Sequence, residues 1–310
     1  MRKRLILLFF VLFGVTVLAF SLSQLSEVNP AEAYIRRTVV NATPEMLAEA
    51  SKSMGYDRPI YEQYGRWLVG CLHGDFGMSL LTRTPVGAEI AKRLPVTLSV
   101  VGLALLWTVL FTAPISVLCV RMKNKWVDQF VRGITIIGVS IPGFWLAFLF
   151  LLLFASHLSW FKVVDPGSLR GLILPSITVS IPVTASMIRL LRTGILEELS
   201  QDYVFYARAR GLSFQRILWL HALPNALPPM ITLLAQYLGG MIAGSAVVES
   251  IFSLRGIGSY LLDAILAYDT PAINGCVVIV AVIFVLCTLV AEGINTKLSP
   301  SIVAEGGEHG

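Results

Sequence analysis

The chain has 310 residues, of which 55% are hydrophobic and only 14% charged, with a net charge of +5. A soluble domain usually carries about 25% charged residues, so this composition places the chain among membrane proteins. The basic excess is not gathered on a soluble module, which argues against a nucleic-acid-binding protein, and no HExxH or CxxC spacing indicates a metal site.

Six runs without charged residues are long enough to be membrane spans, since a helix needs about 20 apolar residues to cross the hydrocarbon core. They cover 5–26, 94–120, 133–161, 171–188, 217–248 and 270–291. We therefore expect an all-α integral membrane protein with six transmembrane helices. The fourth run is short and contains Pro175 and Pro182, so we expect it to be kinked toward protein or a cavity.

The distribution of basic residues predicts the orientation of these spans. Residues 1–4 (MRKR) precede the first run, and 121–132 form a basic connection between the second and third, so the positive-inside rule places both in the cytoplasm. With six spans the carboxyl terminus is then also cytoplasmic. The first run also has features of a signal peptide, but it is longer than a usual apolar region of one, and we treat it as a helix.

The long connection after the first span is expected to be external and helical. Thr43, Pro44 and Glu45 are typical of a helix start, and Gly55 of a helix stop. A second, amphipathic helix is expected from about Pro59 to residue 72. This region either caps its own transmembrane bundle or contacts a partner that delivers substrate.

The connection between the fourth and fifth spans contains the stretch DYVFYARARGLSFQRILWLHALPNALPP, residues 202–229. A short helix is expected from Asp202 to Gly211, because aspartate suits a helix start and glycine can adopt the left-handed conformation that ends a helix. A second helical piece is expected from Phe214 to His221. Taken alone, this basic and aromatic loop could also lie against anionic lipid.

This stretch resembles the cytoplasmic "EAA" loop of ABC importer permeases in the dipeptide, oligopeptide and nickel branch. The matching residues are Asp202-Tyr203-Val204, Ala207-Arg208-Ala209-Arg210-Gly211-Leu212 and His221-Ala222-Leu223-Pro224-Asn225-Ala226. Other similar segments follow the family's order: 74–79 (GDFGMS), 140–145 (SIPGFW), 248–252 (VESIF), 256–258 (GIG) and 269–271 (DTP). The family usually has arginine at position 224 and proline at position 255, where this chain has Pro224 and Arg255.

The resemblance implies an organisation and a set of partners. It divides the chain into residues 1–26 (amino terminus and first helix), 27–93 (external helical loop), 94–296 (five-helix permease core with a coupling loop over 193–226) and 297–310 (cytoplasmic tail). Expected partners are a second homologous permease subunit, cytoplasmic ABC ATPase subunits, an extracytoplasmic substrate-binding protein and membrane lipid, with no nucleic acid. The expected location is the bacterial inner membrane.

In that family the loop forms a coupling helix that docks on the ATPase. The residues that would dock are Asp202, Tyr203, Tyr206, Ala207, Arg208, Ala209, Arg210, Gly211 and Leu212. The chain has no GxxxxGK[ST] motif, so it is not expected to be an enzyme or to bind a cofactor. ATP and Mg would be bound by the partner ATPase.

Candidates for the translocation path or for a subunit interface are Ser140, Trp145, Gln236, Glu249 and Asn274. Glu249 stands out because a carboxylate beside the apolar part of a span is costly unless it has a function. It could contact substrate, contact a partner subunit or extend to the membrane surface. Each of the other four could equally serve packing or hydrogen bonding.

The expected substrate is nickel or a metal chelate, because residues 42–68 look similar to the permeases for nickel and opine metallophores. Import of di- or oligopeptides is the alternative. A secondary transporter or an intramembrane enzyme is disfavoured, because neither mid-span ionisable residues nor a GxSxG motif is present. His73 and His157 lie on the expected outer side, but no metal ligand is assigned.

Overall fold

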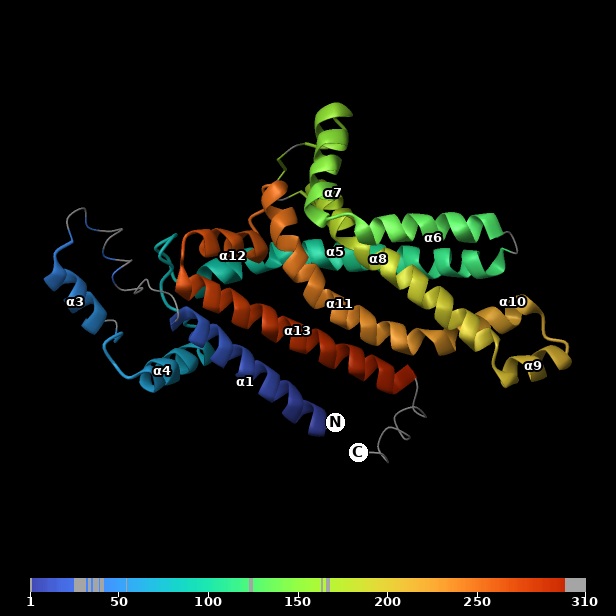
Figure 1. Cartoon of the computed structure of the whole chain (residues 1–310), viewed down its shortest axis with the longest axis horizontal. Helices are drawn as coiled ribbons and strands as arrows, with labels where there is room; N and C mark the ends of the chain where they lie inside the picture. Colours follow the sequence, from blue (N-terminus) through green and yellow to red (C-terminus); the bar gives the residue numbers. More distant parts are fainter. Residues whose placement is uncertain are drawn as a thin grey trace. The chain divides into compact units, whose positions relative to one another are not determined.

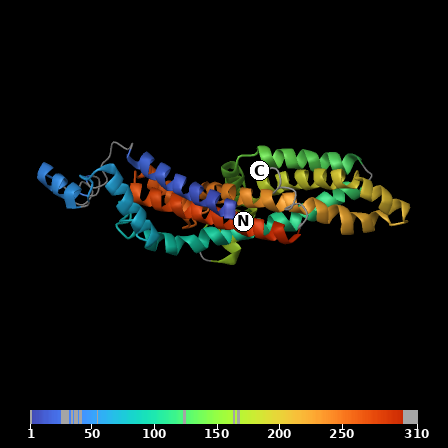
Figure 2. The ribbon, with the colours of Figure 1, turned by 90° about the horizontal axis from the view of Figure 1, so that it is seen from below.

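The computed structural model describes residues 2–24, 32, 35, 39, 42–53, 55–122, 125–162, 164–165 and 168–298. Over these residues the chain is helical, and its extended pairing is limited to an isolated bridge between Met78 and Pro85. Figure 1 shows the helices, and Figure 2 shows the same ribbon turned by 90°. The expected all-α class is confirmed. Most of the predicted tail over 297–310 lies outside the described residues.

The helices divide into two groups by length. The long ones are α1 (Arg2–Gln24), α5 (Val86–Arg121), α8 (Leu169–Leu199), α11 (Leu223–Ile251) and α13 (Thr270–Leu298). The shorter ones are α3 (Pro44–Ser53), α4 (Ile60–Leu72), α6 (Lys125–Ser140), α7 (Gly143–Phe150), α9 (Asp202–Ala209), α10 (Phe214–Ile217) and α12 (Ile257–Leu266), with π-helical turns η1 (Leu151–His157) and η2 (Leu218–Ala222).

Five helices of the described chain are long and apolar enough to cross a membrane, and a sixth span results if a bent pair is counted as one. The pair joins α6 to α7–η1 and is bent by 101°. Pro142 explains the break, because proline pushes the preceding residue out of the helical region and Pro142 itself is extended, at φ −61° and ψ 133°. The predicted span over 133–161 is therefore broken at Pro142, and it forms one span only if the bent pair is counted as one.

Several predicted boundaries also moved outward. The segment 121–132 is not a loop, because α5 extends to Arg121 and α6 begins at Lys125. α8 extends eleven residues beyond the predicted end at 188, so that Arg189 and Arg192 lie within a helix. The predicted boundaries are placed at the first charged residue, but a helix can continue through charged residues as long as its backbone hydrogen bonds continue.

Two compact units make up the fold. Unit 1 takes residues up to Thr97 together with Arg255–Val285, and unit 2 takes Leu98–Leu254 together with residues from Leu286 onward. α5 and α13 contribute to both. The grouping cuts across the predicted core of 94–296, because α12 and the first half of α13 group with the segment that was predicted to be external.

In unit 1 the segment after α4 packs on α5, α12 and α13. Its buried core consists of Phe76, Val86, Ile90, Ile257, Tyr260, Ala264, Ala272, Cys276 and Val278. In the same unit α1 contacts α4, where the Phe20 ring lies 5.4 Å from Tyr64 and 5.6 Å from Trp67. The helix predicted to begin near Pro59 begins at Ile60, and Thr43 accepts a hydrogen bond from the Met46 amide as a helix cap.

α8 is the central helix of unit 2. It packs against α11, α6 and α7. In an 18-residue apolar stretch of α8, 67% of the residues are buried, compared with 22–33% in the same length of the other long helices. Figures 1 and 2 both show α6 lying alongside α8. Their close approach is possible because Gly138 of α6 faces Ala185, where an added Cβ would lie 3.2 Å from the Ala185 Cβ.

Candidate functional site

The loop between α8 and α11 folds as the sequence predicts. α9 begins at Asp202 and ends with a Schellman motif: the Leu212 amide donates to the Ala207 carbonyl at 3.2 Å and the Gly211 amide to the Arg208 carbonyl at 2.9 Å. Gly211 has φ +81°, a conformation that side chains rarely adopt. Ser213 then caps α10, accepting a hydrogen bond from the Arg216 amide.

Tyr203 fastens α9 to the rest of unit 2. Its hydroxyl donates to Glu198 Oε2 at 2.7 Å and accepts from Asn225 Nδ2 at 3.3 Å, and its ring lies 6.4 Å from that of His221. Burial, and then the hydrogen bond to Glu198, raise the pKa of Tyr203, so the hydroxyl stays protonated and donating. One residue thus ties the end of α8 to the start of α11.

The opposite face of α9 is exposed. Phe205 and Tyr206 expose 71% and 67% of their surface, with ring centroids 6.1 Å apart in an edge-to-face arrangement. Asp202, Arg208, Ala209, Arg210 and Gly211 are also exposed, whereas Tyr203, Ala207 and Leu212 are partly buried. Phe205 is not among the predicted docking residues. Two adjacent aromatic residues in a short polar helix would have indicated it, since aromatic residues are enriched at interfaces.

η2 lies at the junction with α11, just before Pro224. Proline lacks an amide hydrogen and clashes with the carbonyl four residues earlier, and a wider turn relieves both problems. The helical path nevertheless continues from α10 through η2 into α11. The coupling loop is therefore joined to α11 without a flexible linker.

Ser140 and Trp145 come together at the break between α6 and α7. They line an open groove of about 410 Å³ together with Ile136, Ile137, Pro142 and Phe144. The Ser140 hydroxyl donates to the Ile136 carbonyl of its own helix at 2.9 Å. The groove therefore offers a mostly apolar surface with little free hydrogen-bonding capacity.

Glu249 and Gln236 both lie on α11 but in different environments. Glu249 is fully buried and accepts a hydrogen bond from the Ser245 hydroxyl at 3.1 Å, whereas Gln236 is exposed. The burial rules out the possibility that Glu249 extends to the membrane surface. Asn274, which is also buried, lies on α13 within unit 1.

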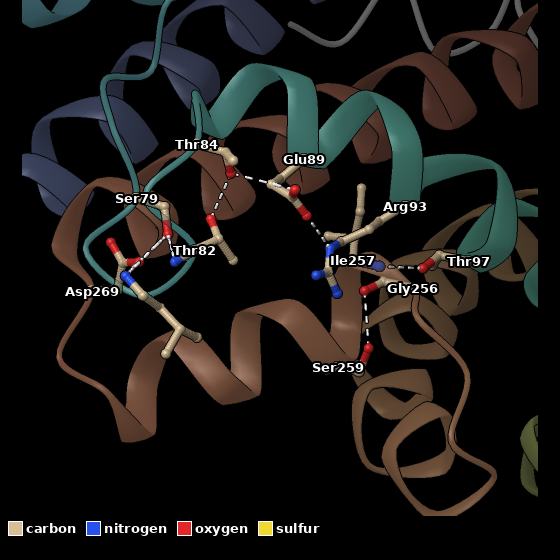
Figure 3. Close-up of polar contacts among 11 residues, drawn as sticks. Ser79, Thr82, Thr84, Glu89, Arg93, Thr97, Gly256, Ile257, Ser259 and Asp269 are labelled. Carbon is tan, nitrogen blue, oxygen red and sulfur yellow. Dashed lines mark hydrogen bonds and ion pairs between the residues drawn. The ribbon is translucent and has the colours of Figure 1, made fainter.

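Unit 1 brings together three of the sequence segments noted above, as Figure 3 shows. Buried Asp269 accepts hydrogen bonds from the Ser79 hydroxyl at 2.5 Å and the Leu81 amide at 2.9 Å. The Ile257 amide donates to Thr97 Oγ1 at 2.8 Å. Hydrogen bonds thus join residues 74–81 to Asp269 and residue 257 to α5, and Phe76 and Ile257 share one apolar core.

A second set of polar contacts lies on α5. Glu89 accepts from the Arg93 guanidinium at 2.9 Å, and that guanidinium lies over the Tyr260 ring, 4.6 Å from its centroid (Figure 3). These contacts join α5 to α12. Because the Glu89 carboxylate and the Arg93 guanidinium satisfy each other, this pair indicates a structural role rather than a reactive one.

The described residues contain no group of three or more histidine, cysteine, aspartate or glutamate residues positioned to hold a metal ion. His73 Nδ1 lies 2.8 Å from the Val69 carbonyl, which accounts for one of its ring nitrogens. His157 lies at the end of η1.

Comparison with known proteins gives consistent results along the whole chain. Residues 94–304 match the family described as the binding-protein-dependent transport system inner membrane component, and residues 1–101 match the amino-terminal family of such membrane components. The chain is 32% identical over 300 residues to the glutathione transport system permease protein GsiC of Escherichia coli (strain K12), covering 97% of each protein. The identity to GsiC of Salmonella paratyphi A is 33%, with the same coverage.

Among solved structures, the fold is similar to that of a chain in an inward-facing conformation of the MetNI methionine ABC transporter. The TM-score is 0.58, and the match covers 68% of this chain and 96% of the other. At 16% identity this likeness shows the fold alone.

Proposed function

The chain belongs to the binding-protein-dependent transport system inner membrane component family and is a permease subunit of an ABC importer, and we propose that its substrate is a short peptide. The observation that carries the proposal is the 32% identity to a glutathione transport permease over 97% of both chains. Glutathione is a tripeptide, so the peptide alternative gains support over nickel. The similarity to nickel and metal-chelate permeases rests on residues 42–68 alone.

In the proposed mechanism, α9 docks on a separate ATPase subunit. Its exposed aromatic pair, Phe205 and Tyr206, supplies two anchors of the kind that dominate protein interfaces, and Arg208 and Arg210 add charged contacts. Tyr203 acts indirectly by holding α9 against α8 and α11. ATP and Mg belong to the ATPase, and this subunit transmits its movement.

The remaining partners follow from the same proposal. A substrate-binding protein delivers the peptide from outside, and a second, homologous permease subunit completes the path. The groove at Ser140 and Trp145 is an apolar surface suited to that subunit or to a peptide side chain. Gln236, Glu249 and Asn274 remain candidates for the path or for a subunit interface, and Glu249 is buried and hydrogen-bonded to Ser245.

The docking of α9 is tested by co-purification of the ATPase with variants of this chain. Phe205→Ala and Tyr206→Ala should each weaken retention of the ATPase about tenfold or more, as expected for truncated interface anchors. Phe130→Ala is the matched control, because Phe130 is similarly exposed, at 68%, but lies on α6. Equal retention in all three variants would show that α9 is not the docking element.

The substrate is tested by uptake in cells that express the complete transporter or lack only this subunit. Radiolabelled glutathione, a labelled dipeptide and radiolabelled nickel with and without a metallophore are offered separately. Subunit-dependent uptake of a peptide, competed by other short peptides but not by nickel, is expected. Subunit-dependent uptake of nickel or its chelate without uptake of peptides would reject the peptide proposal and restore the metal one.

A further inference from the structure

A polar cavity lies between α6 and α8 in unit 2, apart from the coupling helix and the apolar groove. It has a volume of about 250 Å³ and is lined by the polar residues Asp128, Arg132, Thr135, Arg189, Arg192 and Thr193 and by the apolar residues Val131 and Ile188. This is smaller than the roughly 300–1,000 Å³ of pockets for drug-sized ligands, so it suits a small group rather than a whole peptide or nucleotide.

The charges of the cavity do not balance. Asp128 receives hydrogen bonds from Arg192 Nε at 2.5 Å and Nη2 at 2.7 Å, and from Arg132 Nη2 at 3.0 Å. The side chain of Arg189 forms no ion pair or hydrogen bond with any residue that the structure describes. Three permanent positive charges thus face one carboxylate.

The unused donors have a definite chemical preference. Each guanidinium carries five N–H donors, and Arg192 and Arg132 spend only three between them on Asp128. The Thr193 hydroxyl is occupied, because it donates to the Arg189 carbonyl at 3.0 Å. Several arginine N–H groups around one small cavity favour an oxyanion with several acceptor oxygens, and a phosphate group meets that description.

The surroundings of the cavity favour a phosphate carried by lipid. The first turns of α6, which supply Asp128 and Arg132, also expose Trp126 by 80% and Phe130 by 68%. Tryptophan is enriched at the level of lipid headgroups, and basic pockets between transmembrane helices hold such headgroups. Ile134 and Ile137 continue the exposed apolar surface along α6, where acyl chains could lie.

We propose that this cavity is a binding site for a phosphate oxyanion, supplied by the headgroup of an anionic phospholipid. Arg189 provides the uncompensated charge, while Arg132 and Arg192 line the cavity and are held in place by Asp128. The excess positive charge disfavours a zwitterionic headgroup, whose cationic end would meet the arginines. The site binds α6 to α8 through a lipid as well as through the Asp128 ion pairs.

The test uses the assembled transporter in neutral detergent. Radiolabelled dioctanoyl phosphatidylglycerol is titrated onto the wild type and onto Arg189→Gln, Arg189→Lys and Arg216→Gln variants, with dioctanoyl phosphatidylcholine as the headgroup control. Arg189→Gln leaves the Asp128 pairs intact, so folding is preserved. Arg216→Gln removes the same charge from an exposed position on α10, outside the cavity.

Arg189→Gln should weaken phosphatidylglycerol binding about tenfold or more, the value of one lost charged hydrogen bond. Arg189→Lys should weaken it less, Arg216→Gln should leave it unchanged, and phosphatidylcholine should bind poorly. Displacement of the lipid from the wild type by millimolar inorganic phosphate would support a site that recognises the phosphate group. Binding of inorganic phosphate without binding of phosphatidylglycerol would show that the source is the free ion and would overturn the lipid source. Equal binding by Arg189→Gln and wild type, or equal binding of both lipids, would overturn the proposal.

Discussion

Asp269 shows how a single side chain can hold together segments that are distant in sequence. Besides Ser79 and Leu81, its Oδ1 atom accepts from the Ala272 amide at 3.3 Å, so that one buried carboxylate serves three donors. Replacing such a carboxylate leaves buried donors unpaired, which costs more than the net value of the bonds.

Asp269→Asn should therefore lower the free energy of unfolding by about 2 kcal/mol, because the amide group would direct N–H toward at least one of these donors. Thermal unfolding of the detergent-solubilised protein measures the change as a Tm lower by several degrees. Asp263→Asn is the control, since Asp263 is exposed on α12 and its substitution should change little. An Asp269→Asn variant as stable as the control would show that these hydrogen bonds have no net value.

Cys71, on α4, offers a test of local environment by pH. Burial, and next the charge of Asp75, raise the pKa of its thiol to about 11, whereas an ordinary thiol has a pKa of about 8.5. The reactive thiolate is therefore scarce at pH 8, and the greater nucleophilicity of a more basic thiolate offsets only part of this scarcity.

With the other cysteines replaced by serine, Cys71 should react with N-ethylmaleimide on the order of tenfold or more slowly than a cysteine introduced by Leu72→Cys. Leu72 is next to Cys71 in the sequence and is 79% exposed, so a cysteine there reports the rate of an exposed thiol in the same segment. The Cys71 rate should keep rising with pH up to about 11. Equal rates at pH 8, or a plateau near pH 9, would contradict the assigned environment.

The residues of α9 could be predicted because local chemistry determines them. Asp202 begins a helix and Gly211 ends one through short-range interactions that any reader of the sequence can identify. The roles within the helix could not, since Tyr203 turns inward only because Glu198 and Asn225 lie beside it. The buried state of Glu249 likewise depends on tertiary packing, which a hydropathy pattern does not encode.

At the level of elements, the packing of α6 on α8 depends on a glycine. Gly138→Leu should separate these helices and cost about 1–3 kcal/mol, because an added side chain meets Ala185 and Ile181. Gly133→Leu is the matched control on the same helix, where an added Cβ meets nothing within 4 Å. Thermal unfolding distinguishes them, and equal Tm values for the two variants would contradict the packing.

The break in the third predicted span could not be predicted by counting apolar residues. Residues 133–161 are uniformly free of charge, so hydropathy alone makes them one helix. The presence of Pro142 alone does not predict the break, because Pro175 and Pro182 lie inside the continuous helix α8. Whether a proline breaks a helix depends on how neighbouring helices accommodate it, and the sequence of one element does not contain that information.

At the scale of the whole molecule, the predicted orientation makes a direct test available. In a cysteine-free chain, Leu72→Cys should react with a membrane-impermeant maleimide from the outer side, and Phe205→Cys only from the cytoplasmic side. Both positions are highly exposed, so burial does not bias the comparison. Labelling in intact spheroplasts and in inverted membrane vesicles distinguishes the sides. The reverse pattern would contradict the positive-inside assignment.

The unbroken path from α10 through η2 into α11 has a mechanical consequence. Residues Phe214–Ile251 form 38 residues of helix, about 57 Å at 1.5 Å per residue, nearly twice the roughly 30 Å of a hydrocarbon core. The helix has no coil break along this length, but Pro224, Pro228 and Pro229 interrupt its backbone hydrogen bonds near the loop end, so any bending is expected there. If α9 docks on the ATPase as proposed, movement of the loop would reach the neighbourhood of Glu249 through continuous helical backbone.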